Sequence, residues 1–109
     1  MLRESAIAFT YACDIAGIAD RDIDTGVPGS GAILDFVDAV YSGDGLPAAR
    51  AALTDTLGPE AMVDAAAVYA NFEMMNRVAE GSGIHVPRAA LEREASIVAT
   101  LRLDELIKP

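Results

Sequence analysis

The stretch from Pro59 to Gly83 constrains the fold of this chain more than any other feature of its sequence. It begins with a proline and an acid, which favour the first turn of a helix, and it ends in the sequence Gly81-Ser82-Gly83. At about 100° of rotation per residue, Phe72, Met74 and Met75 point to different sides of the predicted helix. We therefore expect a central helix that neighbouring helices cover on at least two flanks.

The other segments also carry helical patterns. Apolar residues recur at spacings of three and four, while glycines and prolines mark the ends of the periodic runs. No segment alternates between apolar and polar residues as a half-buried strand would. The chain is therefore predicted to be all-α, with five helices in one domain over 1–109. The predicted elements are helices at 2–16, 31–41, 47–57, 59–83 and 88–107, a loop at 17–30, and an extended segment at 84–87.

Specific residues set the predicted boundaries. Gly17 is expected to end the first helix, and Ser30 is placed to cap the second. Pro47 occupies the first turn of the third helix, which ends at Gly58. Pro87 keeps the residue before it out of the helical region.

Composition narrows the possible partners. The 17 acidic and 8 basic residues give a net charge of −9, which repels nucleic acid and anionic membrane surfaces. Cys13 is the only cysteine, so neither an internal disulfide nor a cluster of thiolate metal ligands is expected. We also find no pattern of a signal peptide or a membrane span, which predicts a cytoplasmic protein without a metal or another cofactor. The apolar share of 52% is high for a small core and favours contact with another subunit.

Five polar residues fall on one arc of the predicted central helix, and we call them the polar stripe: Tyr69, Glu73, Asn76, Arg77 and Glu80. As a small-molecule site, Glu73 would act as acid or base, Arg77 would hold an anion, and Tyr69 and Asn76 would donate hydrogen bonds. Alternatively, the spacings from Glu73 to Arg77 and from Arg77 to Glu80 are those of ion pairs on a solvated or subunit-facing surface.

Four further residues offer chemistry of their own. Asp64 and Asn71 interrupt the apolar face opposite the stripe, where we expect them to be buried and to hold the packing in place. His85 is the only histidine, and it is either an acid/base group or a solvated loop side chain. Cys13 lies on an apolar stripe, which favours a small buried residue over a nucleophile.

The segment from Ala32 to Val86, and above all Asn71 to Ala79 before Gly83-Ile84, resembles the C-terminal half of the alkylhydroperoxidase D-like and carboxymuconolactone decarboxylase superfamily. The redox members use a Cys-x-x-Cys pair, and this chain lacks that pair. The resemblance therefore implies the family's compact helical bundle, interlocked with other subunits in a dimer, trimer or hexamer, without thiol peroxidase activity.

Three functional hypotheses follow. The leading one is a non-redox homo-oligomer of this superfamily that is structural or binds a small ligand. The second is a cofactor-free lyase or isomerase on a small acidic metabolite, with Glu73 or His85 moving protons and Arg77 holding a carboxylate. It requires Arg77 to line an enclosed pocket beside Tyr69 and Glu73. The third is an accessory subunit that docks on a larger protein.

Overall fold

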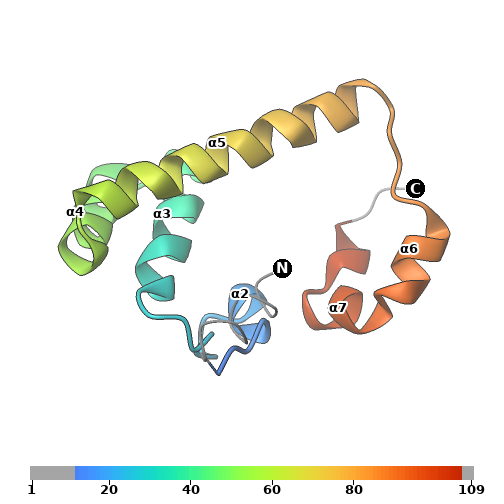
Figure 1. Cartoon of the computed structure of the whole chain (residues 1–109), viewed down its shortest axis with the longest axis horizontal. Coiled ribbons are helices and arrows are strands. Elements are labelled where there is room, and N and C mark those ends of the chain that lie inside the picture. The colour runs from blue at the N-terminus through green and yellow to red at the C-terminus, as the bar shows by residue number, and fades with distance from the viewer. Residues whose placement is uncertain (1–11, 107–109) are drawn as a thin grey trace. The chain divides into compact units, whose positions relative to one another are not determined.

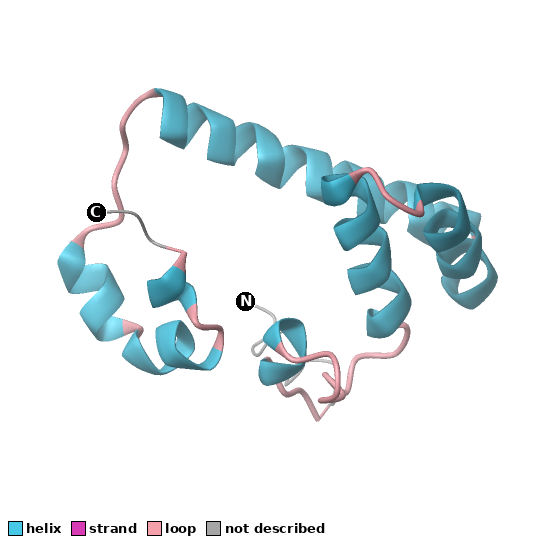
Figure 2. Ribbon diagram, turned by 180° about the vertical axis from the view of Figure 1, so that it is seen from behind, coloured by secondary structure: helices cyan, strands magenta, loops and turns pink. Residues whose placement is uncertain are grey.

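Every regular element in residues 12–106, which the computed structural model describes, is helical, and Figure 2 shows no strand in this part of the chain. The all-α prediction is therefore confirmed at the level of fold class. The elements are α2 (Ala16–Ala19), α3 (Ser30–Ser42), α4 (Leu46–Leu57), α5 (Pro59–Gly81), α6 (Arg88–Arg93), α7 (Ala95–Thr100) and a short 3₁₀ helix, η1 (Leu103–Glu105).

The chain divides into two units. The central unit, Gly29–His85, contains α3, α4 and α5. The terminal unit comprises the segments on either side, of which residues 12–28 and 86–106 are described. The prediction of a single domain over 1–109 stays a prediction.

The core of the central unit lies where α4 packs against α3 and α5 (Figure 1). Phe36 and Ala39 of α3 are buried there, and Leu53 of α4 is fully buried. Phe36 and Leu53 are among the apolar residues that recur at helical spacing, whereas Asp35 and Asp38 of α3 are exposed. Helical periodicity thus placed the inward side chains of α3 and α4.

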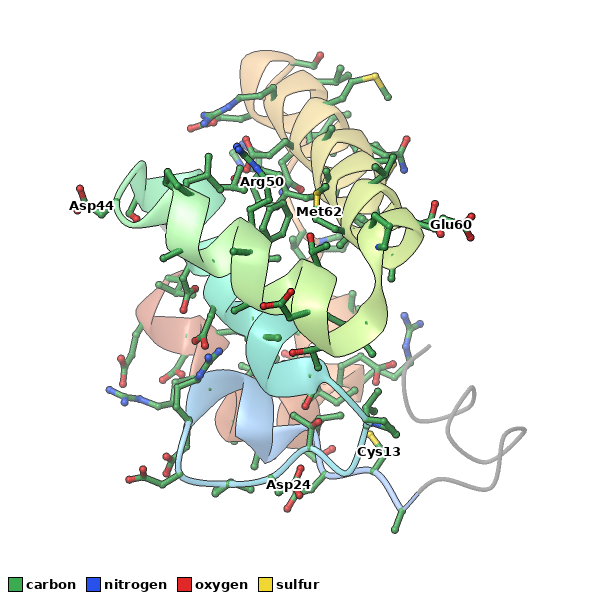
Figure 3. The ribbon with its side chains drawn as sticks, turned by 90° about the vertical axis from the view of Figure 1, so that its left-hand side faces the viewer. Cys13, Asp24, Asp44, Arg50, Glu60 and Met62 are labelled. Atoms are coloured by element: carbon green, nitrogen blue, oxygen red, sulfur yellow. The ribbon has the colours of Figure 1, made fainter. Side chains whose placement is uncertain are left out.

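Gly58 is the only residue between α4 and α5. Its φ of 94° lies in a region that favours glycine, and Pro59 follows at the start of α5. The chain reverses sharply at this point, so the first half of α5 packs on α4. In Figure 3 Met62 lies between α5 and α4, whereas Glu60 points away from both.

α5 is much longer than the helices that it contacts. At 1.5 Å per residue its 23 residues span about 35 Å, whereas the 12 residues of α4 span about 18 Å. In Figure 1 the second half of α5 runs on beyond α4. α4 and α3 both contact α5, yet no residue of α5 is buried within the described part of the chain.

The start of α3 differs from the prediction at its cap. Ser30 is the first residue of the helix, and Gly29 takes the capping position with a φ of 76°. A side chain at Gly29 would also lie 2.7 Å from a methyl group of Leu57. Glycine is needed here because the start of α3 touches the end of α4.

The predicted first helix over 2–16 lies partly outside the described residues, and its described end is wrong. Residues 12–14 are not helical, and α2 begins only at Ala16. The amide of Asp14 donates to the Thr25 carbonyl, and its carboxylate accepts a hydrogen bond from the amide of Ala16, at 3.0 Å. Aspartate competes in this way with helical hydrogen bonds, which apolar spacing does not reveal.

Gly17 was expected to end a helix but lies inside α2 and is buried. A Cβ atom at this position would meet the carbonyl oxygen of Ile23 at 2.5 Å and the methyl group of Thr25 at 2.7 Å. The loop folds back on α2 here, with Thr25 only 4% exposed. Gly17 therefore serves close packing, which is a tertiary requirement.

The predicted last helix, Arg88 to Ile107, is replaced by α6, α7 and η1. The backbone leaves the regular helix at Glu94 (φ −101°, ψ 26°), and Arg102 adopts a left-handed conformation. The Arg102 guanidinium donates two hydrogen bonds to Glu105, of 2.9 and 2.8 Å. An interruption of one residue, as at Glu94, leaves the spacing of the apolar residues unchanged. The spacing therefore cannot distinguish one continuous helix from several short helices.

Within residues 12–106, no helix is both long and apolar enough to cross a bilayer.

Candidate functional site on the long helix

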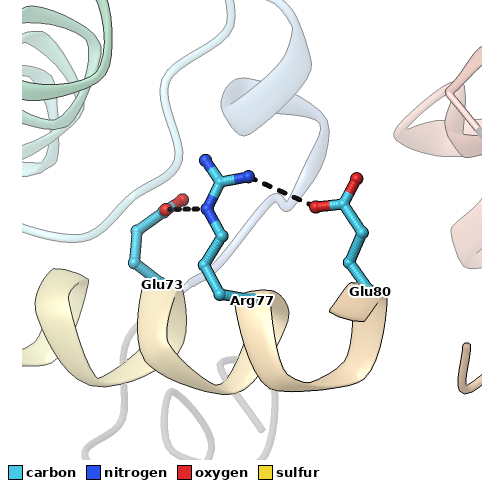
Figure 4. A network of polar contacts seen from close by, with 3 residues as sticks. All are labelled: Glu73, Arg77 and Glu80. Atoms are coloured by element: carbon cyan, nitrogen blue, oxygen red, sulfur yellow. Dashed lines mark hydrogen bonds and ion pairs between the residues drawn. The ribbon is translucent and has the colours of Figure 1, made fainter. Parts of the chain in front are cut away.

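Three members of the polar stripe form a connected ionic network on α5 (Figure 4). The Arg77 Nε atom lies 3.5 Å from a carboxylate oxygen of Glu73, and its Nη1 donates to Glu80 at 3.2 Å. These are the two spacings, of four and three residues, that stabilise pairs along a helix. The guanidinium charge is therefore shared between two carboxylates of its own helix.

The network is open to solvent. The side chains of Arg77 and Glu80 are 70% and 73% exposed, and only Glu73 is half-buried, at 32%. Ion pairs as exposed as these contribute about 0–1 kcal/mol each. Arg77 lacks the enclosure that an anion-holding residue in a small-molecule site needs.

Tyr69 is the stripe residue with a perturbed ionisation. Removal of water around the phenol raises the pKa of Tyr69, and the negative charge of Glu73 raises it further. Tyr41 of α3 adds to this effect, and Arg77 opposes it. A raised pKa keeps the phenol protonated at neutral pH, so Tyr69 is a hydrogen-bond donor there and not a base.

The remaining stripe residue and the histidine stand apart from this network. Asn76 is exposed on α5, and His85 is exposed in the segment that follows the helix. Within residues 12–106 the His85 side chain takes part in no hydrogen bond or ion pair. The structure thus brings together Tyr69, Glu73, Arg77 and Glu80, without His85.

Asp64 and Asn71 do not occupy the buried positions expected of them. Both side chains are exposed, and at 100° per residue they lie almost opposite Met62, which is between α5 and α4. The expectation treated the surrounding alanines, valines and methionines as a core-facing surface. Within residues 12–106 both polar side chains are exposed along with the apolar residues around them.

The exposed side of α5 is mainly apolar. At 100° per residue its members span an arc of about 160°, and all are exposed. Five large apolar side chains on this arc are between 44% and 59% exposed. We call the part of this arc from Val63 to Val78 the outer face of α5, and it consists of Val63, Asp64, Ala67, Val68, Ala70, Asn71, Met74, Met75 and Val78. Glu60 and Gly81 are also exposed and lie on the same arc, nearer the two ends of the helix.

The opposite arc of α5 carries the partly covered residues. Met62, Ala65, Ala66, Tyr69 and Glu73 are all of intermediate exposure. A helix at the surface of a globular protein normally turns its large apolar side chains toward the core and its polar side chains toward water. In α5 the large apolar side chains of the outer face are exposed, while Tyr69 and Glu73 are partly covered. A run of large exposed side chains on one helix face is typical of an interaction surface.

No group of histidine, cysteine and acidic side chains in residues 12–106 is arranged to hold a metal ion. Shallow open depressions lie elsewhere on the chain. One lies at the start of α5, beside Pro59, Glu60, Val63 and Asp64, and another lies beside α6 and α7. Neither depression includes a member of the polar stripe.

The outer face is the feature that sequence reasoning recognised but placed wrongly. The signal was present in the even spread of apolar residues around 59–81 and in the 52% apolar content. The spread of apolar residues predicts a helix that neighbouring helices cover, whereas the apolar content favours contact with another subunit. No known protein family, curated protein or solved structure matches this chain.

Proposed function

We propose that this chain is a non-redox, homo-oligomeric helical protein with a structural role, and that the outer face of α5 forms a contact between subunits. One observation carries the proposal. Within the described part of the chain the 23-residue helix α5 buries no residue, although its outer face presents three valines and two methionines, each at least 44% exposed. Burial of such an apolar surface against a partner lowers the free energy of the system, because the surface is removed from water.

We further propose a relationship to the carboxymuconolactone decarboxylase-like superfamily. The resemblance covers Ala32 to Val86, which coincides closely with the central unit, Gly29–His85. That coincidence supports a family-like unit that folds together. The missing Cys-x-x-Cys pair argues for a role other than thiol redox chemistry.

A cofactor-free lyase or isomerase receives less support. Its required anion-holding residue, Arg77, is 70% exposed and already paired with two carboxylates of α5. Its second proton carrier, His85, is exposed and outside the network. We therefore place the function in the outer face and not in the polar stripe.

The proposal is tested by the mass of the protein in solution. Light scattering after gel filtration, at micromolar concentration, is expected to give a multiple of 11.4 kDa. A monomer with the full helical signal in circular dichroism would contradict the proposal. In that case the outer face would be covered by the chain itself or by a different protein.

A pair of variants on α5 locates the contact. Met74→Glu places a charge on the outer face, where Met74 is 59% exposed, and Asn76→Glu places the same charge outside it. Because a charge buried without a partner costs several kcal/mol, we expect Met74→Glu to weaken assembly by about 100-fold or more. Asn76→Glu is expected to keep the wild-type mass. Equal masses for the two variants would remove the outer face from the interface.

A further inference from the structure

A polar residue, Asn71, lies near the centre of the outer face. Asn71 lies within about 20° of the middle of the arc and one residue from the midpoint of α5. Ala67 and Met74 lie close to it in angle on one side, and Val68 and Met75 lie on the other. A single amide is therefore surrounded by apolar side chains on an exposed helix surface.

An amide is suited to meet its own copy. It offers both a donor and an acceptor, so two asparagines related by a two-fold axis can exchange hydrogen bonds. A two-fold contact uses the same patch on both subunits and must therefore be self-complementary. An asparagine within an apolar helix contact fixes the register, because any shift leaves its polar atoms unpaired.

We propose that a second copy of this chain packs against the outer face, with the two α5 helices antiparallel and crossing at Asn71. This inference rests on the proposed homo-oligomer and specifies how its subunits meet. In an antiparallel pair centred on Asn71, Ala67 of one copy lies within one residue of Met74 of the other, measured along the helix axis. The same holds for Val68 and Met75, so small and large side chains interlock.

The charges of the outer face favour this direction. In a parallel pair, Asp64 would face its own copy at close range, and like charges in contact are destabilising. In the antiparallel pair, Asp64 of one copy lies beside Val78 of the other, and the two aspartates are about 21 Å apart along the helix. At physiological salt, charges at that separation are largely screened. Antiparallel packing also places the positive end of each helix dipole beside the negative end of the other, which is favourable.

Length is a second reason to choose another α5 as the occupant. The outer face extends from Val63 to Val78, along most of a 23-residue helix. The next longest helix in residues 12–106 is α3, with 13 residues, and its apolar face is used by Phe36 and Ala39 in the core. Another α5 has both the length and an uncovered apolar surface to match.

Single-cysteine variants test the geometry. Cys13, the only native cysteine, is first replaced by serine, and one cysteine is then introduced at Asn71, Asp64 or Val78. Disulfides need Cα atoms about 4.4–6.8 Å apart, so oxidation reports close approach of identical or paired positions. Asn76→Cys, on the same helix but outside the outer face, is the matched control for random collision.

The antiparallel pair predicts a distinctive pattern. Asn71→Cys is expected to form a covalent dimer, whereas Asp64→Cys and Val78→Cys are each expected to stay uncrosslinked. An equimolar mixture of the last two is expected to form a mixed dimer, which mass spectrometry identifies. Asn76→Cys is expected to give none.

Other outcomes separate two kinds of failure. Self-linking of Asp64→Cys would mean parallel helices, and an oligomer without an Asn71→Cys dimer would mean a different interface. Either result overturns the antiparallel pair and leaves the homo-oligomer in place. A monomeric mass in light scattering overturns both.

Discussion

Replacement of Leu53 by alanine tests whether the core of the central unit lies where α4 meets its neighbours. Leu53 is fully buried, with an exposed fraction of 0%, and it is the largest such side chain among the described residues. Its truncation removes apolar contact and leaves a cavity, so we expect the free energy of unfolding to fall by about 2–5 kcal/mol. Leu57, one turn later on the same helix, is 38% exposed and provides a matched control. We expect about 1–2 kcal/mol for Leu57→Ala, because only part of that side chain is out of water.

Urea unfolding followed by far-UV circular dichroism measures both variants. Protein concentration must be equal throughout, because assembly adds to the apparent stability. The expected result is a lower midpoint for both variants, with the larger shift for Leu53→Ala and an unchanged slope. Equal losses at the two positions would refute the burial argument, since the substitution is chemically identical.

Three other predictions concern substitutions at single positions. A Cβ atom at Gly17 would meet Ile23 and Thr25 of the loop at 2.5–2.9 Å, and the Thr25 carbonyl accepts the hydrogen bond of the Asp14 amide, so Gly17→Ala should expose that amide to hydrogen exchange. Gly31 has open space around it, so Gly31→Ala should raise the free energy of unfolding by about 0.5–1 kcal/mol. Gly17→Ala with full Asp14 protection would contradict the close approach. Arg77→Ala should change the free energy of unfolding by less than about 1 kcal/mol, since its ion pairs are exposed, and a larger loss would mean that they are shielded in the assembly. Tyr69 should titrate above its ordinary pKa in ultraviolet absorbance, with its signal identified by its loss in Tyr69→Phe, and a Tyr69 signal that titrates at or below the ordinary pKa would contradict the shift. Because the folded state holds the proton more tightly, this group's contribution to stability is complete below the unfolded pKa and falls as pH rises through the folded one.

The sequence determined the local structure of the central unit closely. α5 begins at Pro59 as predicted and ends at Gly81, the first residue of the predicted Gly81-Ser82-Gly83 terminus, and α4 ends at Leu57 before Gly58. Proline in a first turn and glycine past a last turn act through their own backbone restrictions, so they work in the same way in any tertiary setting. The exposed ionic network of Arg77 was likewise predictable, because its partners lie three and four residues away on one helix.

Local patterns failed where the answer depended on contacts between distant residues. Apolar spacing predicts a helix end at Gly17, yet the residue is glycine because the loop at Ile23 and Thr25 lies against it. The helix expected over 88–107 is interrupted at Glu94, and a one-residue break leaves the apolar spacing unchanged.

Only the tertiary structure decided what covers α5. The sequence established that the helix is apolar on most sides, but the same pattern suits a helix buried by its own chain and a helix buried by another. The central unit offers α3 and α4, and these cover only one arc of a helix about 35 Å long. The Asp64 and Asn71 side chains are consequently exposed in the described part of the chain. Their surroundings are set by which surfaces meet, and helical periodicity carries no information about that.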